Sequence, residues 1–128
     1  MKLTESLSYV CIFNTKEYSS LFKDEELKKK MYDIINEFPN QMKKNDVKII
    51  SVFVYLKHVE ITFETSSSKD LTRFVSNLKS VSSRKFLKHI KSDREGIWTK
   101  NYLIATQEDQ LDQKIDLFLK PQEFKSIF

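Results

Sequence analysis

Glycine is almost absent from this chain, since Gly96 is the single glycine among 128 residues. The phosphate-cradling loops of mononucleotide- and dinucleotide-binding folds need several glycines, because the backbone must approach the ligand closely there. The sequence therefore excludes a glycine-rich nucleotide-binding loop.

Cysteine is equally rare. Cys11 is the single cysteine, so the chain can form no internal disulfide and no zinc site built from cysteines. Its place in an alternating apolar stretch predicts a buried structural thiol inside a strand. This cysteine usage is typical of proteins in a reducing cytoplasm, which is where we expect this one.

Long apolar runs are missing as well. No run approaches the ~20 consecutive apolar residues that a membrane-spanning helix needs. Residues 1–5 also lack the apolar core of a signal peptide. We therefore expect no membrane segment and no membrane partner.

The remaining composition is that of one compact domain. Hydrophobic residues make up 40% and charged residues 31% of a chain long enough to bury a core, so we expect a single domain spanning residues 1–128. The formal net charge is +4 and the sequence pI is about 9.1. This mild positive charge suits a phosphate-bearing partner, and it is also an ordinary charge for solubility.

Hydrophobic periodicity predicts the elements of the fold. Alternation of apolar and polar residues predicts strands at residues 7–15, 47–56, 58–65 and 98–106. Helical spacing predicts helices at residues 25–38, 71–90 and 109–120. Asp24 can cap the first helix, and Pro39 can end it or shift its axis. The order β-α-β-β-α-β-α favours an α+β fold, a ferredoxin-like split βαβ with a four-stranded antiparallel sheet and an added C-terminal helix.

His58 and Glu60 project from the same face of the predicted strand 58–65, roughly 7 Å apart at about 3.3 Å per residue. An imidazole and a carboxylate side by side on a rigid strand can hold a divalent metal. A solvated polar face of the sheet explains the same pair. His58 and Glu60 alone do not distinguish these two interpretations.

Five segments occur in an order and spacing that are typical of one family. They are a strand ending in a threonine-lysine turn at Phe13–Tyr18, a histidine strand at His58–Ile61, a leucine-lysine segment with serine and arginine at Leu78–Arg84, a tryptophan strand at Trp98–Thr106, and a final helix with Phe118 and Gln122. On these segments the chain resembles the small single-tyrosine HUH transposases of insertion sequences, the IS200-like transposases, and the repeat-associated tyrosine transposases.

The resemblance implies a homodimeric protein that acts on single-stranded or hairpin DNA. In the family, two histidines and a glutamine hold a divalent metal, which polarises a phosphodiester. A tyrosine on the last helix attacks the phosphorus and becomes linked to the DNA. Carried over to this chain, the resemblance implies His58, Glu60 and Gln122 as metal ligands and a weakly bound Mg²⁺ or Mn²⁺ as the ion.

The chain departs from the family at the positions that carry the chemistry. Phe118 stands where the tyrosine is expected, and its ring has no oxygen with which to attack phosphorus. Glu60 replaces a histidine. Pro121 lies between Phe118 and Gln122 and disturbs the helical register that would bring both to one face. We therefore interpret the chain as a catalytically inactive relative.

A basic stretch coincides with the segment that resembles the DNA-contacting region of the family. Its expected nucleic-acid-binding residues are Lys79, Arg84, Lys85, Lys88, Lys91 and Arg94. Phosphate contacts of this kind give salt-dependent affinity rather than sequence preference. A solvated helix surface is the alternative. Preference for hairpins or single strands would come from aromatic stacking, for which Phe86 and Tyr18 are candidates.

Three functions compete on this reading of the sequence. The first is a homodimeric binder of single-stranded or hairpin nucleic acid, DNA or RNA, without strand transfer. The second is an active metal-dependent nicking or transposition enzyme that uses His58, Glu60 and another nucleophile. The third is a regulatory or interaction module that keeps only the fold.

Overall fold

The computed structural model describes residues 7–16, 20–41, 47–65 and 71–106, together with four helical residues further on, Gln113, Ile115, Phe118 and Leu119. The elements are β1 (Leu7–Thr15), α1 (Glu25–Gln41), β2 (Lys48–Val54), β3 (His58–Thr65), α2 (Leu71–His89) and β4 (Trp98–Thr106).

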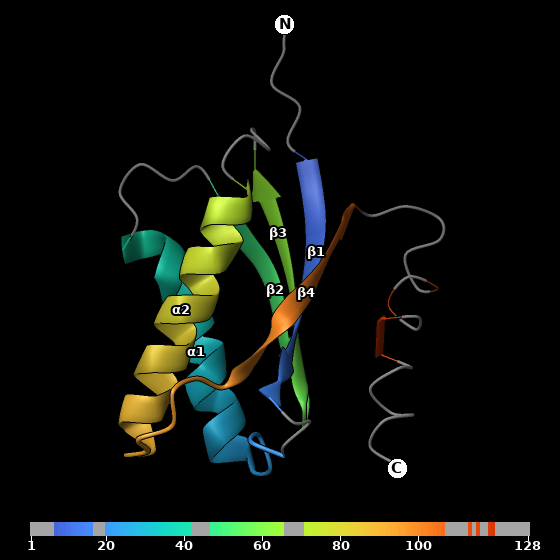
Figure 1. Ribbon diagram of the computed structural model, residues 1–128. Coiled ribbons are helices and arrows are strands. Elements are labelled where there is room, and N and C mark those ends of the chain that lie inside the picture. Colours follow the sequence, from blue (N-terminus) through green and yellow to red (C-terminus); the bar gives the residue numbers. More distant parts are fainter. Residues whose placement is uncertain are drawn as a thin grey trace, which may run out of the picture.

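The strands form one four-stranded sheet in the order β2-β3-β1-β4. Every pair in it is antiparallel. Figure 1 shows α1 and α2 together on one face of the sheet. This arrangement confirms the predicted α+β, ferredoxin-like split βαβ. Four residues of the predicted C-terminal helix are helical, and the rest of that segment lies outside the described residues.

Most element bounds agree with the periodicity of the sequence. β1, β3 and β4 have the predicted bounds, whereas β2 covers Lys48–Val54 rather than the predicted residues 47–56. It is shorter because residues 55–57 form the turn into β3, where the Tyr55 amide donates to the His58 carbonyl over 2.8 Å. Asp24 caps α1 as predicted, with its Oδ1 accepting from the Leu27 amide at 2.9 Å. The helix continues two residues beyond Pro39.

The core lies between the sheet and the two helices. Alternate residues of the two central strands point into it, and Cys11, Phe13, Val59, Ile61 and Phe63 are completely buried. Cys11 is therefore the structural thiol that the sequence predicts. Burial raises the pKa of this thiol far above its ordinary value, so it stays protonated and unreactive.

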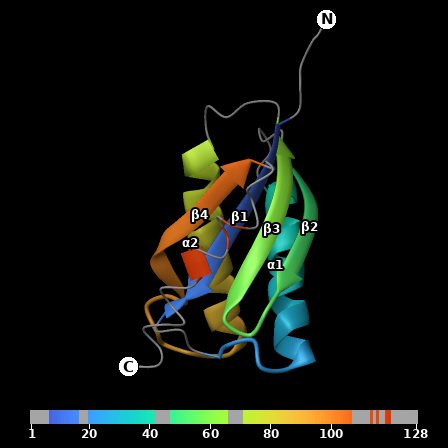
Figure 2. The same cartoon turned by 90° about the vertical axis from the view of Figure 1, so that its right-hand side faces the viewer.

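His58 and Glu60 lie on the other face of the sheet, which we call the open face. They alternate with the buried Val59 and Ile61, and both are half-buried. Figure 2 shows that neither main helix covers this face. The predicted position of the His58–Glu60 pair, opposite the helices, is confirmed.

Two adjacent serines attach the start of β4 to α2. The indole Nε1 of Trp98 donates to Ser82 Oγ over 2.9 Å, and both side chains are buried. The Ile97 amide donates to Ser83 Oγ over 3.1 Å. Serine has only modest helix propensity, but here the pair supplies the acceptors that fix a strand against the helix.

No helix among the residues that the structure describes is long and apolar enough to cross a membrane.

Replacing Ser82 with alanine should lower the free energy of unfolding by about 1–3 kcal/mol, because the buried Trp98 indole would lose its acceptor. Urea unfolding of the Ser82→Ala variant measures this change. The control is Ser80→Ala, because Ser80 is exposed on the same helix and its replacement by alanine raises the helix propensity by the same amount. Equal stabilities of the two variants would contradict a stabilising role for the bond.

Candidate nucleic-acid interface

A concave pocket with a volume of about 620 Å³ lies where α2, the α2–β4 connection and the end of β1 meet. Its cationic lining residues are Lys16, Lys79, Arg84, Lys88 and Arg94. Glu95 is the single acid among its described lining residues. We call this surface the basic hollow. Its charge favours an anionic ligand.

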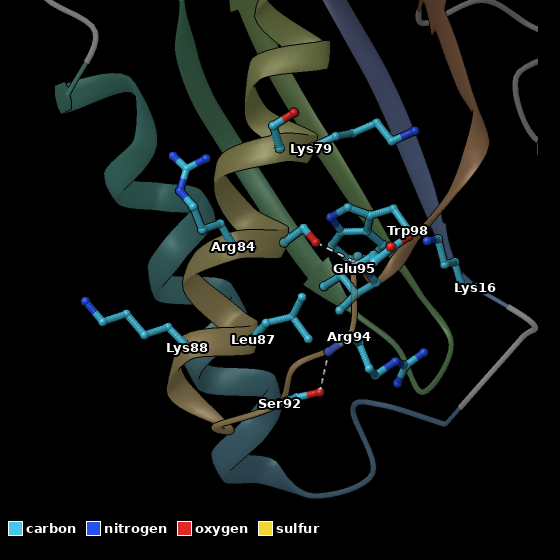
Figure 3. A pocket seen from close by; sticks show the side chains of 13 residues that line it. Lys16, Lys79, Arg84, Leu87, Lys88, Ser92, Arg94, Glu95 and Trp98 are labelled. Carbon is cyan, nitrogen blue, oxygen red and sulfur yellow. Dashed lines mark hydrogen bonds between the residues drawn. The ribbon is translucent and has the colours of Figure 1, made fainter.

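The cations border the hollow and do not converge on one point. In Figure 3, Arg84 and Lys88 extend to one side of α2, whereas Lys16 and Arg94 lie on the other side. A small anion held by several cations would need their side chains to point at one centre. A wide rim of positive charge instead suits an extended chain of phosphates.

Lys79 is engaged within the protein. Its Nζ donates to the Thr99 carbonyl over 2.7 Å and to the Lys100 carbonyl over 3.0 Å. The same ammonium lies 5.3 Å from the ring centre of Tyr102. Desolvation lowers the pKa of Lys79, and the nearby Cys11 acts in the opposite direction. Lys79 thus links α2 to β4, and its predicted contact with nucleic acid stays a prediction.

The hollow brings together four of the six predicted binding residues, Lys79, Arg84, Lys88 and Arg94. Lys85 and Lys91 are not among its lining residues. Lys16 also lines the hollow. The sequence did not predict this, because Lys16 is far in sequence from the basic stretch. The available signal was its place in the threonine-lysine turn that ends the first strand.

Lys91 has a structural position of its own at the end of α2. Its φ is 55°, which lies in the left-handed region that favours glycine. The Ser92 amide donates to the Leu87 carbonyl over 3.0 Å, and the Lys91 amide donates to the Lys88 carbonyl over 3.3 Å. These two bonds form a Schellman cap, which turns the chain into the loop that bears Arg94.

The His58–Glu60 pair offers a neutral imidazole beside a carboxylate. Tyr55 stacks on His58, with the ring centres 4.5 Å apart and an angle of 20° between the planes. Burial lowers the pKa of His58, so the imidazole is neutral near pH 7. Desolvation raises the pKa of Tyr55, and the charge of Glu60 adds to that shift.

The described residues contain no group of three or more histidine, cysteine, aspartate or glutamate side chains placed to hold a metal. The third predicted ligand, Gln122, lies outside the described residues, as does Pro121. His58 and Glu60 are chemically suitable donors for Mg²⁺ or Mn²⁺, but the described part of the chain supplies only this pair in the family position. Phe118 is helical and half-buried.

Of the two aromatic residues considered for base stacking, Phe86 was a wrong candidate. Its side chain is completely buried and packs against Phe22, with the ring centres 5.4 Å apart. Helical periodicity already placed it on the apolar face of α2. The other candidate, Tyr18, lies outside the described residues.

Comparisons with known proteins agree with this architecture. Residues 3–122 match the family described as IS200-like transposases. A candidate transposase from Deinococcus radiodurans has a solved structure with a TM-score of 0.80 and 20% sequence identity, and the alignment covers 92% of each chain. A comparison with curated proteins returns no match.

Two more distant structures align less well. A REP-associated tyrosine transposase bound to a REP hairpin gives a TM-score of 0.47 and 9% identity over 92% of this chain and 68% of that one. A de novo designed protein with a ferredoxin fold gives a TM-score of 0.45 and 8% identity over 81% and 86% of the two chains.

The partial burial of His58 predicts that the stability of the fold depends on pH. Because its pKa is lower in the folded protein, the unfolded chain binds the proton more readily, and the free energy of unfolding should fall as the pH drops below about 6.5. Urea unfolding between pH 7.5 and pH 5 should show a weaker pH dependence in His58→Gln. His89→Gln, at the exposed end of α2, is the control and should follow the unmodified protein.

Proposed function

Because the chain belongs to the IS200-like transposase family, we propose that it binds single-stranded or hairpin nucleic acid through the basic hollow and does not carry out strand transfer. The observation that carries this proposal is the rim of cations around a concave surface at the junction of α2 and β4.

The arrangement of charge supports binding to a phosphate backbone. Arg84, Lys88 and Arg94 are exposed, and in Figure 3 their side chains extend from two sides of the hollow. An arginine can form two parallel hydrogen bonds to one phosphate, whereas a lysine acts as a point charge. Such contacts hold the backbone without reading base edges, so affinity should depend strongly on salt.

The absence of strand transfer follows from the residue at the nucleophile position. Attack on phosphorus requires an oxygen held in line with the scissile bond and near a Lewis acid. Phe118 provides a ring of tyrosine shape without the hydroxyl. His58 and Glu60 would hold a divalent ion weakly, because two protein donors leave most of the coordination sphere to water.

A homodimer is part of the proposal. It rests on the resemblance to the family and on the open sheet, in which β2 and β4 are the edge strands, because the edge of a sheet can pair with a second chain. We propose DNA as the first partner to test, with RNA as the comparison.

Removing the cations of the hollow should reduce the salt dependence of binding. We expect the triple variant Arg84→Ala/Lys88→Ala/Arg94→Ala to bind a hairpin DNA with a single-stranded tail more weakly. The slope of log association constant against log salt should shrink by about two units, at ~0.7 per lost phosphate contact on a single strand. Fluorescence anisotropy over a salt series measures both quantities.

The matched control is Lys23→Ala/Lys29→Ala/Lys30→Ala, which removes the same charge in and before α1, away from the hollow. Its slope should stay close to that of the unmodified protein. Equal losses in the two triple variants would show that net charge alone drives binding and that the hollow is a solvated surface.

The unmodified protein should form no covalent adduct with hairpin DNA in the presence of Mn²⁺, because Phe118 has no nucleophilic oxygen. Denaturing gel electrophoresis detects such an adduct directly. The variant Phe118→Tyr/Glu60→His restores the family pattern and serves as the comparison. A covalent band with the unmodified protein would overturn the inactive assignment, since it would require a nucleophile elsewhere in the chain.

A further inference from the structure

Two large aromatic side chains are exposed on the open face, near one end of the sheet. Phe53 is 54% exposed and Tyr55 is 44% exposed. We propose that these two rings form a stacking platform for an unpaired nucleobase. This inference rests on the proposed function, because it names the part of the nucleic acid that the open face would recognise.

The strand register places both rings on the open face. Phe53 pairs with Glu60, and Val54 pairs with the core-facing Val59, so the next residue, Tyr55, lies opposite His58. Side chains directly opposite one another on neighbouring strands lie about 4.5–5.5 Å apart. Phe53 and Tyr55 are therefore two residues apart on the same side of one chain segment, beside the His58–Glu60 pair.

Tyr55 is already held in the geometry of a stack. Its ring lies nearly parallel to the His58 imidazole, at 4.5 Å between ring centres, and almost half of the side chain remains exposed. A ring fixed in this way loses little conformational freedom when a base stacks on it, which favours binding. Every base has a π-face, so the platform would accept any unpaired base.

Tyr55, directly after β2, faces His58 at the start of β3, and the next residue in this cross-strand row is Asn14 on β1, which pairs with His58. Its side chain is 1% exposed, and its amide nitrogen Nδ2 has no hydrogen-bond partner among the described residues. Buried polar groups are almost always paired. Asn14 thus leaves an unpaired polar group in the same cross-strand row as Tyr55 and His58, enclosed beneath the surface rather than displayed on it.

The platform and the basic hollow lie at the same end of the sheet. The Thr15 amide and Oγ1 both donate to the Lys57 carbonyl in the β2–β3 turn, over 2.9 Å and 3.0 Å. The following residue, Lys16, lines the hollow, and its amide donates to the Ile97 carbonyl over 2.7 Å. A strand whose phosphates follow the hollow would thus reach the platform around the end of β1.

The test compares two hairpin DNA probes that differ only in the single-stranded tail, one with normal bases and one with abasic sites. We expect Tyr55→Ala and Phe53→Ala to weaken binding of the normal tail by about 5- to 100-fold and to leave binding of the abasic tail unchanged. The salt slope should stay the same, because a stack involves no phosphate. Tyr55→Phe, which keeps the ring, should bind like the unmodified protein.

Tyr32→Ala is the matched control, because Tyr32 is 46% exposed on α1, in the helix layer. It should bind both probes normally. Tyr55→Leu keeps the apolar bulk without the ring, so it should lose the same affinity as Tyr55→Ala while remaining folded. Normal binding by the leucine variant, or equal losses in the Tyr55→Ala and Tyr32→Ala variants, would overturn the platform.

Other outcomes separate this inference from the proposed function. If the unmodified protein binds with a steep salt slope but the platform variants bind both tails normally, only the platform is wrong. If the unmodified protein binds neither probe, the proposed function and the platform fail together. If Phe53→Ala instead converts a dimer into a monomer in light scattering, with no dependence on tail bases, the aromatic pair is an interface between two copies and the platform is overturned.

Discussion

β1 is hydrogen-bonded on both sides, to β3 and to β4, and its residues from Tyr9 to Thr15 are all buried. This central position constrains the rest of the molecule, because successive side chains of a strand point to opposite faces. A slip of one residue in its pairing would exchange the core-facing Cys11 and Phe13 with the open-face Ile12 and Asn14. The burial of both sets fixes the register, and with it the face on which His58 stands.

The end of β1 joins the two surfaces that we connect with nucleic acid. Thr15 is bonded to the β2–β3 turn, and Lys16 is bonded to the segment that enters β4. The turn that follows the aromatic residues and the segment that enters β4 beside the hollow are therefore both hydrogen-bonded to the same strand end. Rigid attachment keeps the distance between a charge surface and a stacking surface constant, which reduces the entropy cost of binding a ligand that uses both.

In the function that we propose, this chain keeps the scaffold of the family without its chemistry. The fold, the tryptophan strand and the cationic junction are all present, and each depends on packing or on surface charge. Strand transfer in the family depends instead on single atoms. One of them is the tyrosine hydroxyl oxygen, which Phe118 of this chain lacks. Losing one atom leaves packing almost unchanged, so the same core can persist without the reaction.

The sequence by itself determined the elements, the faces of the strands and the cap at Asp24, because these depend on local periodicity and on neighbouring residues. The five segments that resemble the family are also visible in the sequence alone. The tertiary structure decided which side chains are free to bind. Lys79 is tied to carbonyls 20 and 21 residues away, and Lys16 joins a basic surface built mainly from α2 and the start of β4. Composition and spacing could not show these outcomes, since each depends on contacts between segments that only folding brings together.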